Sequence, residues 1–225
     1  MSCIFAVCVD DLSEKSFREI YQRMPKDRQT RTDGHKHHID KMRSVAAFHA
    51  LETGLMQYEN MDYISQTIKI SYGESGKPYL PDFPEIDFSI SHSGKYAICA
   101  VGRDGDIGAD ILHIRKTDMR IAKRFFAPSE IDQLEQTDDE AQRDRLFVQI
   151  WTRKESYVKF TGEGLKVDLS DFAMDPLTKR LIIHDRIFPV HFWEIEEPEG
   201  YIITVCCNID PTKTWEYKKI DPNHD

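Results

Sequence analysis

Short apolar stretches recur along the chain and predict β-strands, while polar and amphipathic stretches between them predict helices and loops. In the first half the predicted elements are a strand at 4–9, a helix at 14–24, a loop at 33–38, a helix from about 40 to 58, a strand at 67–72, an ordered loop at 73–84, and a hairpin of strands at 88–93 and 96–101. Asp40 is suited to cap the second of these helices, and Gly94 to form the hairpin turn.

The second half follows a similar order. Its predicted elements are a strand at 107–112, helices at 118–126 and 129–134, a polar connection at 135–145, a central helix that stops at Gly162, and strands at 172–174, 181–184, 191–195 and 201–207. Pro128 fits the first position of the helix that follows it, where a missing N–H costs nothing.

The two halves resemble each other, because residues 94–101 and 200–207 both begin with glycine and continue as apolar strands. Strand composition alone also produces such a short match. We predict an α+β fold of two duplicated, pseudo-twofold-related lobes, residues 1–105 and 106–225, with antiparallel-rich sheets covered by helices. The two lobes form one compact unit, and a ligand site is expected between them.

Composition supports a globular protein, with 225 residues, 40% of them hydrophobic and 31% charged. No apolar run approaches the length of a membrane span, and the first residues predict a strand and not a signal peptide. Four of the five cysteines (Cys8, Cys99, Cys206 and Cys207) lie in strand-like stretches. Buried, reduced thiols in a cytoplasmic protein are therefore expected.

The net charge of −9 argues against general nucleic-acid binding. The charge is uneven, however, because residues 18–43 hold eight Lys and Arg against four Asp and Glu. A local positive field on an acidic protein favours a small anionic ligand over a polyanion.

The central helix carries an unusual stripe, because Trp151, Glu155 and Lys159 are spaced i, i+4 and i+8. The simpler interpretation is a solvent-facing Glu–Lys pair contributing roughly 0.2–0.5 kcal/mol. Upstream, Asp110 ends an apolar strand, where a carboxylate is more often a turn residue. Together, two carboxylates and a lysine can hold one hard cation and an anionic substrate, and Mg²⁺ suits such a set.

Three other motifs are less specific. Ser91-His92-Ser93 lacks the G-x-S-x-G elbow of a hydrolase, so it equally suits phosphate binding at a strand end. The histidines at 35, 37 and 38 lie on a polar loop and are expected to be solvated. The stretch 73–78 lacks the spacing of a P-loop.

These pieces together resemble one family. Ile107-Gly-Ala-Asp-Ile111 with Trp151-x-x-Lys-Glu-Ser-x-x-Lys159 resembles the paired signature of the 4′-phosphopantetheinyl transferases. Further motifs resemble those of the surfactin-synthetase-activating (Sfp) type of this family. They are Gly76-Lys-Pro78, Phe88-Ser-Ile-Ser-His-Ser93, Arg124-Phe-Phe126 and Gly162-Glu-Gly-Leu165. The resemblance covers nearly the whole chain, including its two-lobe organisation.

The resemblance implies an enzyme, a holo-[acyl-carrier-protein] synthase. Such enzymes transfer the phosphopantetheine arm of coenzyme A to a serine of an apo carrier protein, and leave adenosine 3′,5′-bisphosphate. It implies that Asp110 and Glu155 hold Mg²⁺, that Glu155 is the candidate base, and that Lys159 binds the pyrophosphate, so that all three are catalytic. The coenzyme A-binding positions it implies are Arg28, Arg31, Arg43, Lys77, Pro78, Ser91, His92 and Lys159.

One departure from the family is Leu112, where many relatives carry a third acid; a water is expected to complete the metal shell instead. The cations Arg115, Lys116, Arg120, Lys123 and Arg124 are predicted to dock an acidic carrier, and a solvated helix face is the alternative. We expect a cytoplasmic monomer that binds neither membrane nor nucleic acid. Two other functions stay open, a Mg²⁺-dependent phosphohydrolase and a non-catalytic module that binds coenzyme A or a carrier.

Overall fold

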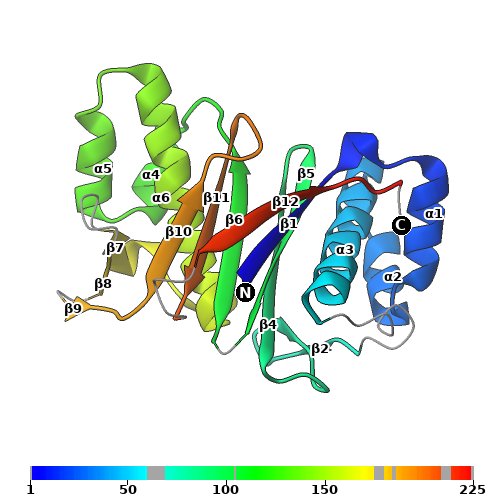
Figure 1. Cartoon of the computed structure of the whole chain (residues 1–225). Helices are drawn as coiled ribbons and strands as arrows, with labels where there is room; N and C mark the ends of the chain where they lie inside the picture. Colours follow the sequence, from blue (N-terminus) through cyan, green and yellow to red (C-terminus); the bar gives the residue numbers. More distant parts are fainter. Residues whose placement is uncertain are drawn as a thin grey trace.

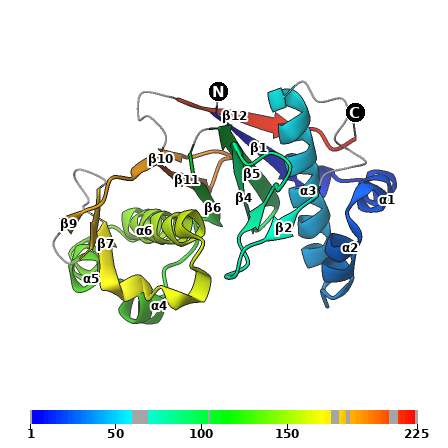
Figure 2. The ribbon, with the colours of Figure 1, turned by 90° about the horizontal axis from the view of Figure 1, so that it is seen from below.

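Two sheets lie side by side between two groups of helices in the computed structural model, which describes residues 2–59, 69–103, 105–174, 180–183, 186–208 and 214–223 (Figure 1). The first sheet has the strand order β12-β1-β5-β4 and the second has the order β10-β11-β6. Seen from below, α3 covers the outer side of one sheet and α6 that of the other (Figure 2). This arrangement confirms the predicted α+β fold.

The described part of the first lobe runs from a strand through helices to a hairpin. Its elements are β1 (Ser2–Cys8), a 3-10 turn (Val9–Asp11), α1 (Glu14–Arg23), α2 (Lys26–Asp33), α3 (His38–Glu59), β4 (Ile86–Ser93) and β5 (Tyr96–Arg103), with the short pair β2 (Ser71–Tyr72) and β3 (Pro78–Tyr79) beside them. A hydrophobic core packs α3 against the sheet, and its largest buried side chains include Phe5, Leu51 and Phe88. Burying such a side chain fully contributes about 1.5–3 kcal/mol.

The second lobe repeats this order. Its elements are β6 (Ile107–His113), α4 (Met119–Phe125), α5 (Pro128–Glu135), α6 (Glu140–Thr161), 3-10 turns at Gly164–Lys166 and Leu169–Asp171, β10 (His191–Ile195) and β11 (Tyr201–Cys207), with a small sheet of β7 (Phe172–Met174), β8 (Leu181–Ile183) and β9 (Arg186–Ile187). In each lobe the opening strand pairs antiparallel with the last strand, which pairs antiparallel with the strand before it.

The last strand, β12 (Trp215–Ile220), lies outside this repeat. It returns to the first sheet and pairs parallel with β1, from Ser2 opposite Trp215 to Val7 opposite Ile220. Beyond it, the Asn223 side chain accepts a hydrogen bond from the Ser16 hydroxyl at 2.8 Å and donates one to the carbonyl of Asp11 at 2.7 Å. The end of the described chain is therefore fastened to its beginning.

The two lobes meet along a polar ladder between β4 and β6. Every second side chain of β4 accepts a hydrogen bond from a backbone N–H of β6: Asp87 from Ile107 at 2.7 Å, Ser89 from Ala109 at 2.8 Å, Ser91 from Ile111 at 3.4 Å, and Ser93 from His113 at 3.1 Å. A shared apolar cluster that includes Ile4, Ile98 and Ile203 packs beside this ladder. Side chains thus replace the backbone pairing that would join β4 to β6 in one continuous sheet.

Most predicted elements are confirmed, and three details are wrong. Helix α3 begins at His38, so that Asp40 lies inside its first turn; the central helix begins at Glu140, within the predicted connection; and residues 78–79 of the predicted loop form β3. Helix α2 lies where no element was predicted. Strand β12 was not predicted. Of the strand predicted at 67–72, residues 67 and 68 lie outside the described residues, as does residue 184 of the strand predicted at 181–184.

Candidate active site at the seam between the lobes

Asp110 lies on β6, where the second lobe faces the polar ladder. Its side chain is largely buried, and its Oδ1 accepts hydrogen bonds from the Ser91 hydroxyl at 2.7 Å and from Lys159 Nζ at 2.7 Å. Lys159 Nζ also donates to the carbonyl of Ala109 at 3.1 Å. The structure therefore brings together Ser91 of the first lobe with Asp110 and Lys159 of the second.

Gly108 makes this contact possible. A Cβ atom at Gly108 would lie 1.9 Å from the carbonyl oxygen of Ser156 and 2.2 Å from the backbone nitrogen of Phe160. Only glycine permits so close an approach between a strand and a helix backbone. Helix α6 therefore lies directly on β6, and residues one helical turn apart on α6 face Asp110.

Glu155 is the second carboxylate of the site, one turn before Lys159 on α6. Burial raises the pKa of the Glu155 carboxyl, the negative charge of Asp110 raises it further, and Lys159 opposes both effects. Glu155 is half-buried, and its carboxylate has no hydrogen bond to any described residue. The negative charge of Asp110 thus acts on Glu155 across the β6–α6 contact, and Lys159, which donates a hydrogen bond to Asp110, also acts on Glu155.

The remaining member of the helical stripe belongs to the core. Trp151 stacks on Phe147 with ring centroids 6.0 Å apart and meets Phe125 edge-on at 5.7 Å. These rings, together with Leu112, pack α4, α5 and α6 on the second sheet. Leu112 is thus part of an apolar cluster. Among the described residues, no group of three or more His, Cys, Asp or Glu side chains is arranged to hold a metal ion.

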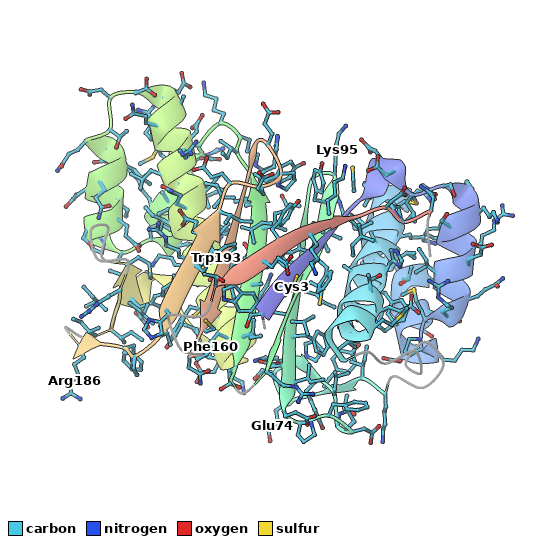
Figure 3. The ribbon with its side chains drawn as sticks, in the orientation of Figure 1. Cys3, Glu74, Lys95, Phe160, Arg186 and Trp193 are labelled. Carbon is cyan, nitrogen blue, oxygen red and sulfur yellow. The ribbon has the colours of Figure 1, made fainter. Side chains whose placement is uncertain are left out.

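A pocket of about 240 Å³ opens beside these groups. It is lined by the 75–78 loop, β4 and the end of α6, with Lys77, Pro78, Ile90, Lys159 and Gly162 among its residues. Gly162 ends α6 in the left-handed conformation, φ 68°, and the Lys77 side chain packs against it. Lys77 Nζ donates hydrogen bonds to Asp87 at 2.8 Å and to the carbonyl of Phe160 at 3.3 Å. Phe160 is labelled near the end of α6 in Figure 3. The two lobes therefore share the walls of this pocket.

His92 and Arg43 lie at the other end of β4. Arg43 Nε donates to the carbonyl of Gly94 at 2.9 Å, and its Nη1 donates to Asp40 at 2.9 Å. Partial desolvation and the positive charges of Arg43 and Lys159 lower the pKa of the exposed His92 ring. The positive charges of Arg43 and Lys159 therefore both act at the His92 ring, as they would around one anionic ligand.

Arg28 and Arg31 are placed differently, on α2. The Arg31 guanidinium lies 3.9 Å from the ring centroid of Tyr72, and that of Arg28 lies 5.9 Å from the ring centroid of Phe48. Burial lowers the pKa of Arg28. None of the described contacts joins either arginine to Arg43 or His92, so a shared basic site for all four residues stays a prediction.

Two features of this region were missed by sequence reasoning. The first is the ladder, whose signal was visible as Asp, Ser, Ser and Ser at alternate positions of residues 87–93. The second is Lys154, which together with Glu130 is fully buried, and whose Nζ lies 2.8 Å from the Glu130 carboxylate. Lys154 also donates to the carbonyls of Leu169 and Phe172, at 2.7 and 2.5 Å. Lys154 is thus fully buried in an ion pair, whereas its neighbour Glu155 is half-buried and faces the site. No local sequence pattern predicts this difference.

The cations predicted to dock a carrier are exposed, but several are already paired. Lys116 lies 3.0 Å from Glu140, Arg120 lies 2.8 Å from Asp118, and Lys123 lies 3.3 Å from Glu135. The net positive charge of this face is smaller than the sequence indicated, and the docking surface stays a prediction.

Comparison with known proteins places this geometry in context. Residues 106–206, which contain Asp110, Glu155 and Lys159, match the family described as the 4′-phosphopantetheinyl transferase superfamily. A 4′-phosphopantetheinyl transferase of Bacillus subtilis is 35% identical over 158 residues, covering 65% of this chain and 70% of that protein. Another relative, 4′-phosphopantetheinyl transferase gsp of Aneurinibacillus migulanus, is 32% identical over 172 residues, 76% of this chain and 70% of its own. The transferase Sfp of Bacillus subtilis strain 168 is 36% identical over 142 residues, 62% of each chain.

Proposed function

The chain belongs to the 4′-phosphopantetheinyl transferase superfamily, and we propose that the seam between its lobes transfers the phosphopantetheine group of coenzyme A to a serine of an apo carrier protein. One observation carries the proposal: Asp110, Glu155 and Lys159 converge where β6 meets α6, beside a pocket walled by both lobes. Residues 1–105 and 106–225 are the two lobes in this proposal.

Asp110 and Glu155 suit a magnesium ion. They are two hard oxygen donors, and their mutual repulsion contributes to the raised pKa of Glu155. Mg²⁺ takes few protein carboxylates and fills its shell with water and phosphate oxygens, so a leucine at 112 is compatible with the site. When bound, the ion would supply positive charge against the pyrophosphate of coenzyme A.

Glu155 is the proposed base. The serine oxygen of the carrier forms a bond to the phosphorus that carries the pantetheine arm, and the phosphoanhydride bond to the nucleotide breaks. Glu155 takes the serine proton, directly or through a water, and adenosine 3′,5′-bisphosphate leaves. A carboxylate with a raised pKa is better matched to this task than an exposed one.

Lys159 and the residues at the end of β4 would bind the phosphates. Lys159 lies beside Asp110 and lines the pocket, so its ammonium can meet the pyrophosphate. Arg43 and His92 would bind the 3′-phosphate, and Ser91 would hold Asp110 next to these groups. Lys77 and Pro78 line the pocket proposed for the adenine, and Arg28 and Arg31 would contribute to the local field.

The cellular compartment and the oligomeric state are also proposals. All five cysteines are buried, and Cys3, Cys8, Cys99 and Cys206 are free thiols, which supports a reducing compartment such as the cytoplasm. Among the described residues no helix is both long and apolar enough to cross a membrane. We propose that the chain acts as a monomer, because each lobe supplies part of one site within a single chain.

Product analysis distinguishes this function from its alternatives. The protein is incubated with coenzyme A, Mg²⁺ and an apo carrier, and the carrier is weighed by mass spectrometry while nucleotides are separated by chromatography. A carrier that gains one phosphopantetheine, with one equivalent of adenosine 3′,5′-bisphosphate, supports the transferase. Free nucleotide with an unmodified carrier would indicate a phosphohydrolase, and no product would indicate a binding module.

A further inference from the structure

The turn between β4 and β5 is held from both lobes at once. From the first lobe, Arg43 Nε donates to the carbonyl of Gly94 at 2.9 Å. From the second lobe, the Tyr201 hydroxyl accepts a hydrogen bond from the backbone N–H of Lys95 at 3.1 Å. Figure 3 labels Lys95 at the tip of this hairpin, and Figure 1 shows the β10–β11 connection next to it.

Tyr201 is fixed in the orientation that this contact requires. It is only 6% exposed, and it is paired through the β11 backbone with His113 of β6. Its ring lies edge-on to Tyr96 with centroids 5.1 Å apart, and 4.7 Å from the ring of His113. A ring packed on two sides has little rotational freedom, so its hydroxyl acts as a rigid support.

Gly94 is matched to this hydroxyl. Its φ of +52° lies in the left-handed region, and a Cβ atom there would come within 2.4 Å of the Tyr201 hydroxyl oxygen. Both the backbone conformation and the closeness of Tyr201 therefore favour glycine. Gly94 and the Tyr201 hydroxyl therefore pack closely, and a change in either residue should displace the turn.

This turn connects the two side chains proposed for the 3′-phosphate. His92 comes two residues before Gly94, and Arg43 holds the Gly94 carbonyl with one guanidinium nitrogen and Asp40 with another. The guanidinium is thus oriented by the turn itself. A phosphate site works best when its donors are already in place, because ordering them on binding costs affinity.

We propose that Tyr201 is a positioning residue for the nucleotide phosphate site: its hydroxyl fixes the Gly94–Lys95 turn, and the turn sets Arg43 and His92 for the 3′-phosphate of coenzyme A. This inference rests on the proposed function. It assigns to a side chain of the second lobe a role in binding a ligand group held by the first lobe.

The test is Tyr201→Phe, which keeps the ring and removes the hydroxyl. Losing a hydrogen bond to a backbone N–H should raise the KM for coenzyme A roughly five- to tenfold. The KM for 3′-dephospho-coenzyme A and kcat should stay at the wild-type values, because none of the described contacts of the Tyr201 hydroxyl involves Asp110, Glu155 or Lys159. A purely structural defect would lower the active fraction and so reduce the rate equally with both donors.

Tyr217→Phe is the matched control. Its hydroxyl is buried and has no hydrogen-bond partner among the described residues, so its removal should leave both KM values unchanged. Gly94→Ala tests the same contact from the other side, and should raise the KM for coenzyme A selectively. In the Tyr201→Phe background the added methyl no longer meets a hydroxyl, so its effect should be smaller than in the wild type.

The outcomes separate the two claims. If the wild type modifies the carrier but Tyr201→Phe and Gly94→Ala, both folded, leave the KM for coenzyme A unchanged, the positioning role is wrong. Equal rises with both donors would also overturn it. A wild type that modifies no carrier with either donor would instead overturn the proposed function.

Discussion

Gly108→Ala should separate the two halves of the catalytic site by adding one methyl group. The new Cβ would lie 1.9 Å from the Ser156 carbonyl, whereas ordinary contacts begin at 3.4 Å, so the helix must retreat by about 1.5 Å, which is 3.4 minus 1.9. The nearest atoms belong to the backbone and cannot rotate away. Because Glu155 and Lys159 travel with α6, both should move away from Asp110.

The expected cost has two parts. Overpacking of this kind typically destabilises a protein by about 1–3 kcal/mol, which a chemical denaturation curve measures. A displacement of about 1 Å at reacting groups can lower turnover about a hundredfold. We therefore expect kcat for carrier modification to fall about a hundredfold in Gly108→Ala, measured on the folded fraction with saturating coenzyme A and Mg²⁺.

Gly54→Ala provides the control for stability. A Cβ atom there would lie 2.9 Å from the side chain of Phe5 and 3.0 Å from that of Val101, both in the core of the first lobe. It should reduce stability with kcat unchanged. If folded Gly108→Ala turns over at the wild-type rate, the close packing of α6 on β6 does not position the site.

Three further predictions concern single side chains. Arg43→Ala should weaken coenzyme A far more than 3′-dephospho-coenzyme A in calorimetry, since arginine–phosphate contacts are charge-assisted; equal weakening would place Arg43 elsewhere. Ser91→Ala should lower Mg²⁺-dependent activity at least about tenfold by releasing Asp110, whereas Ser93→Ala, which loses a ladder contact without touching Asp110, should lower it less; equal effects would mean that the ladder alone matters. For Glu52, burial raises the carboxyl pKa, but the His49 ring, whose Nδ1 lies 3.7 Å away, and the hydrogen bonds from Arg23 outweigh burial and lower the pKa. The stabilisation from Glu52 is therefore present at neutral pH and lost as pH falls below the unfolded value of 4.5. Glu52→Gln should cost about 1–3 kcal/mol at neutral pH and flatten the acid limb of stability measured by urea denaturation; an unchanged acid limb would contradict the assignment.

Local patterns predicted the elements whose own residues determine them. The β4–β5 hairpin joins an alternating strand to an apolar one through Gly94, which has a positive φ, and Pro128 stands at the first position of α5 as expected. Helix α2 was missed because all eight of its residues are polar and only Thr32 is buried, so no apolar face indicated a helix. Strand β12 was missed because its partner β1 lies at the other end of the chain, and such a pairing leaves no local signal.

The candidate site was predictable to a similar extent. The spacing of Glu155 and Lys159 and their resemblance to a family signature predicted that they would meet Asp110, and the structure brings Lys159 within 2.7 Å of it. Tertiary contacts decide the rest. The Ser91 hydroxyl engages Asp110, and Tyr201 binds the turn of the other lobe because the fold brings the β10–β11 and β4–β5 hairpins together.

Glu155→Gln tests the central claim most directly, because it keeps the shape of the side chain and removes both the proposed base and one metal charge. The measurement is the rate at which an apo carrier gains the mass of one phosphopantetheine, with purified, folded variant and wild type at equal concentration. We predict a loss of at least about a hundredfold in turnover, the scale typical of a general base. A Glu155→Gln variant that modifies the carrier at a near-wild-type rate would contradict the account.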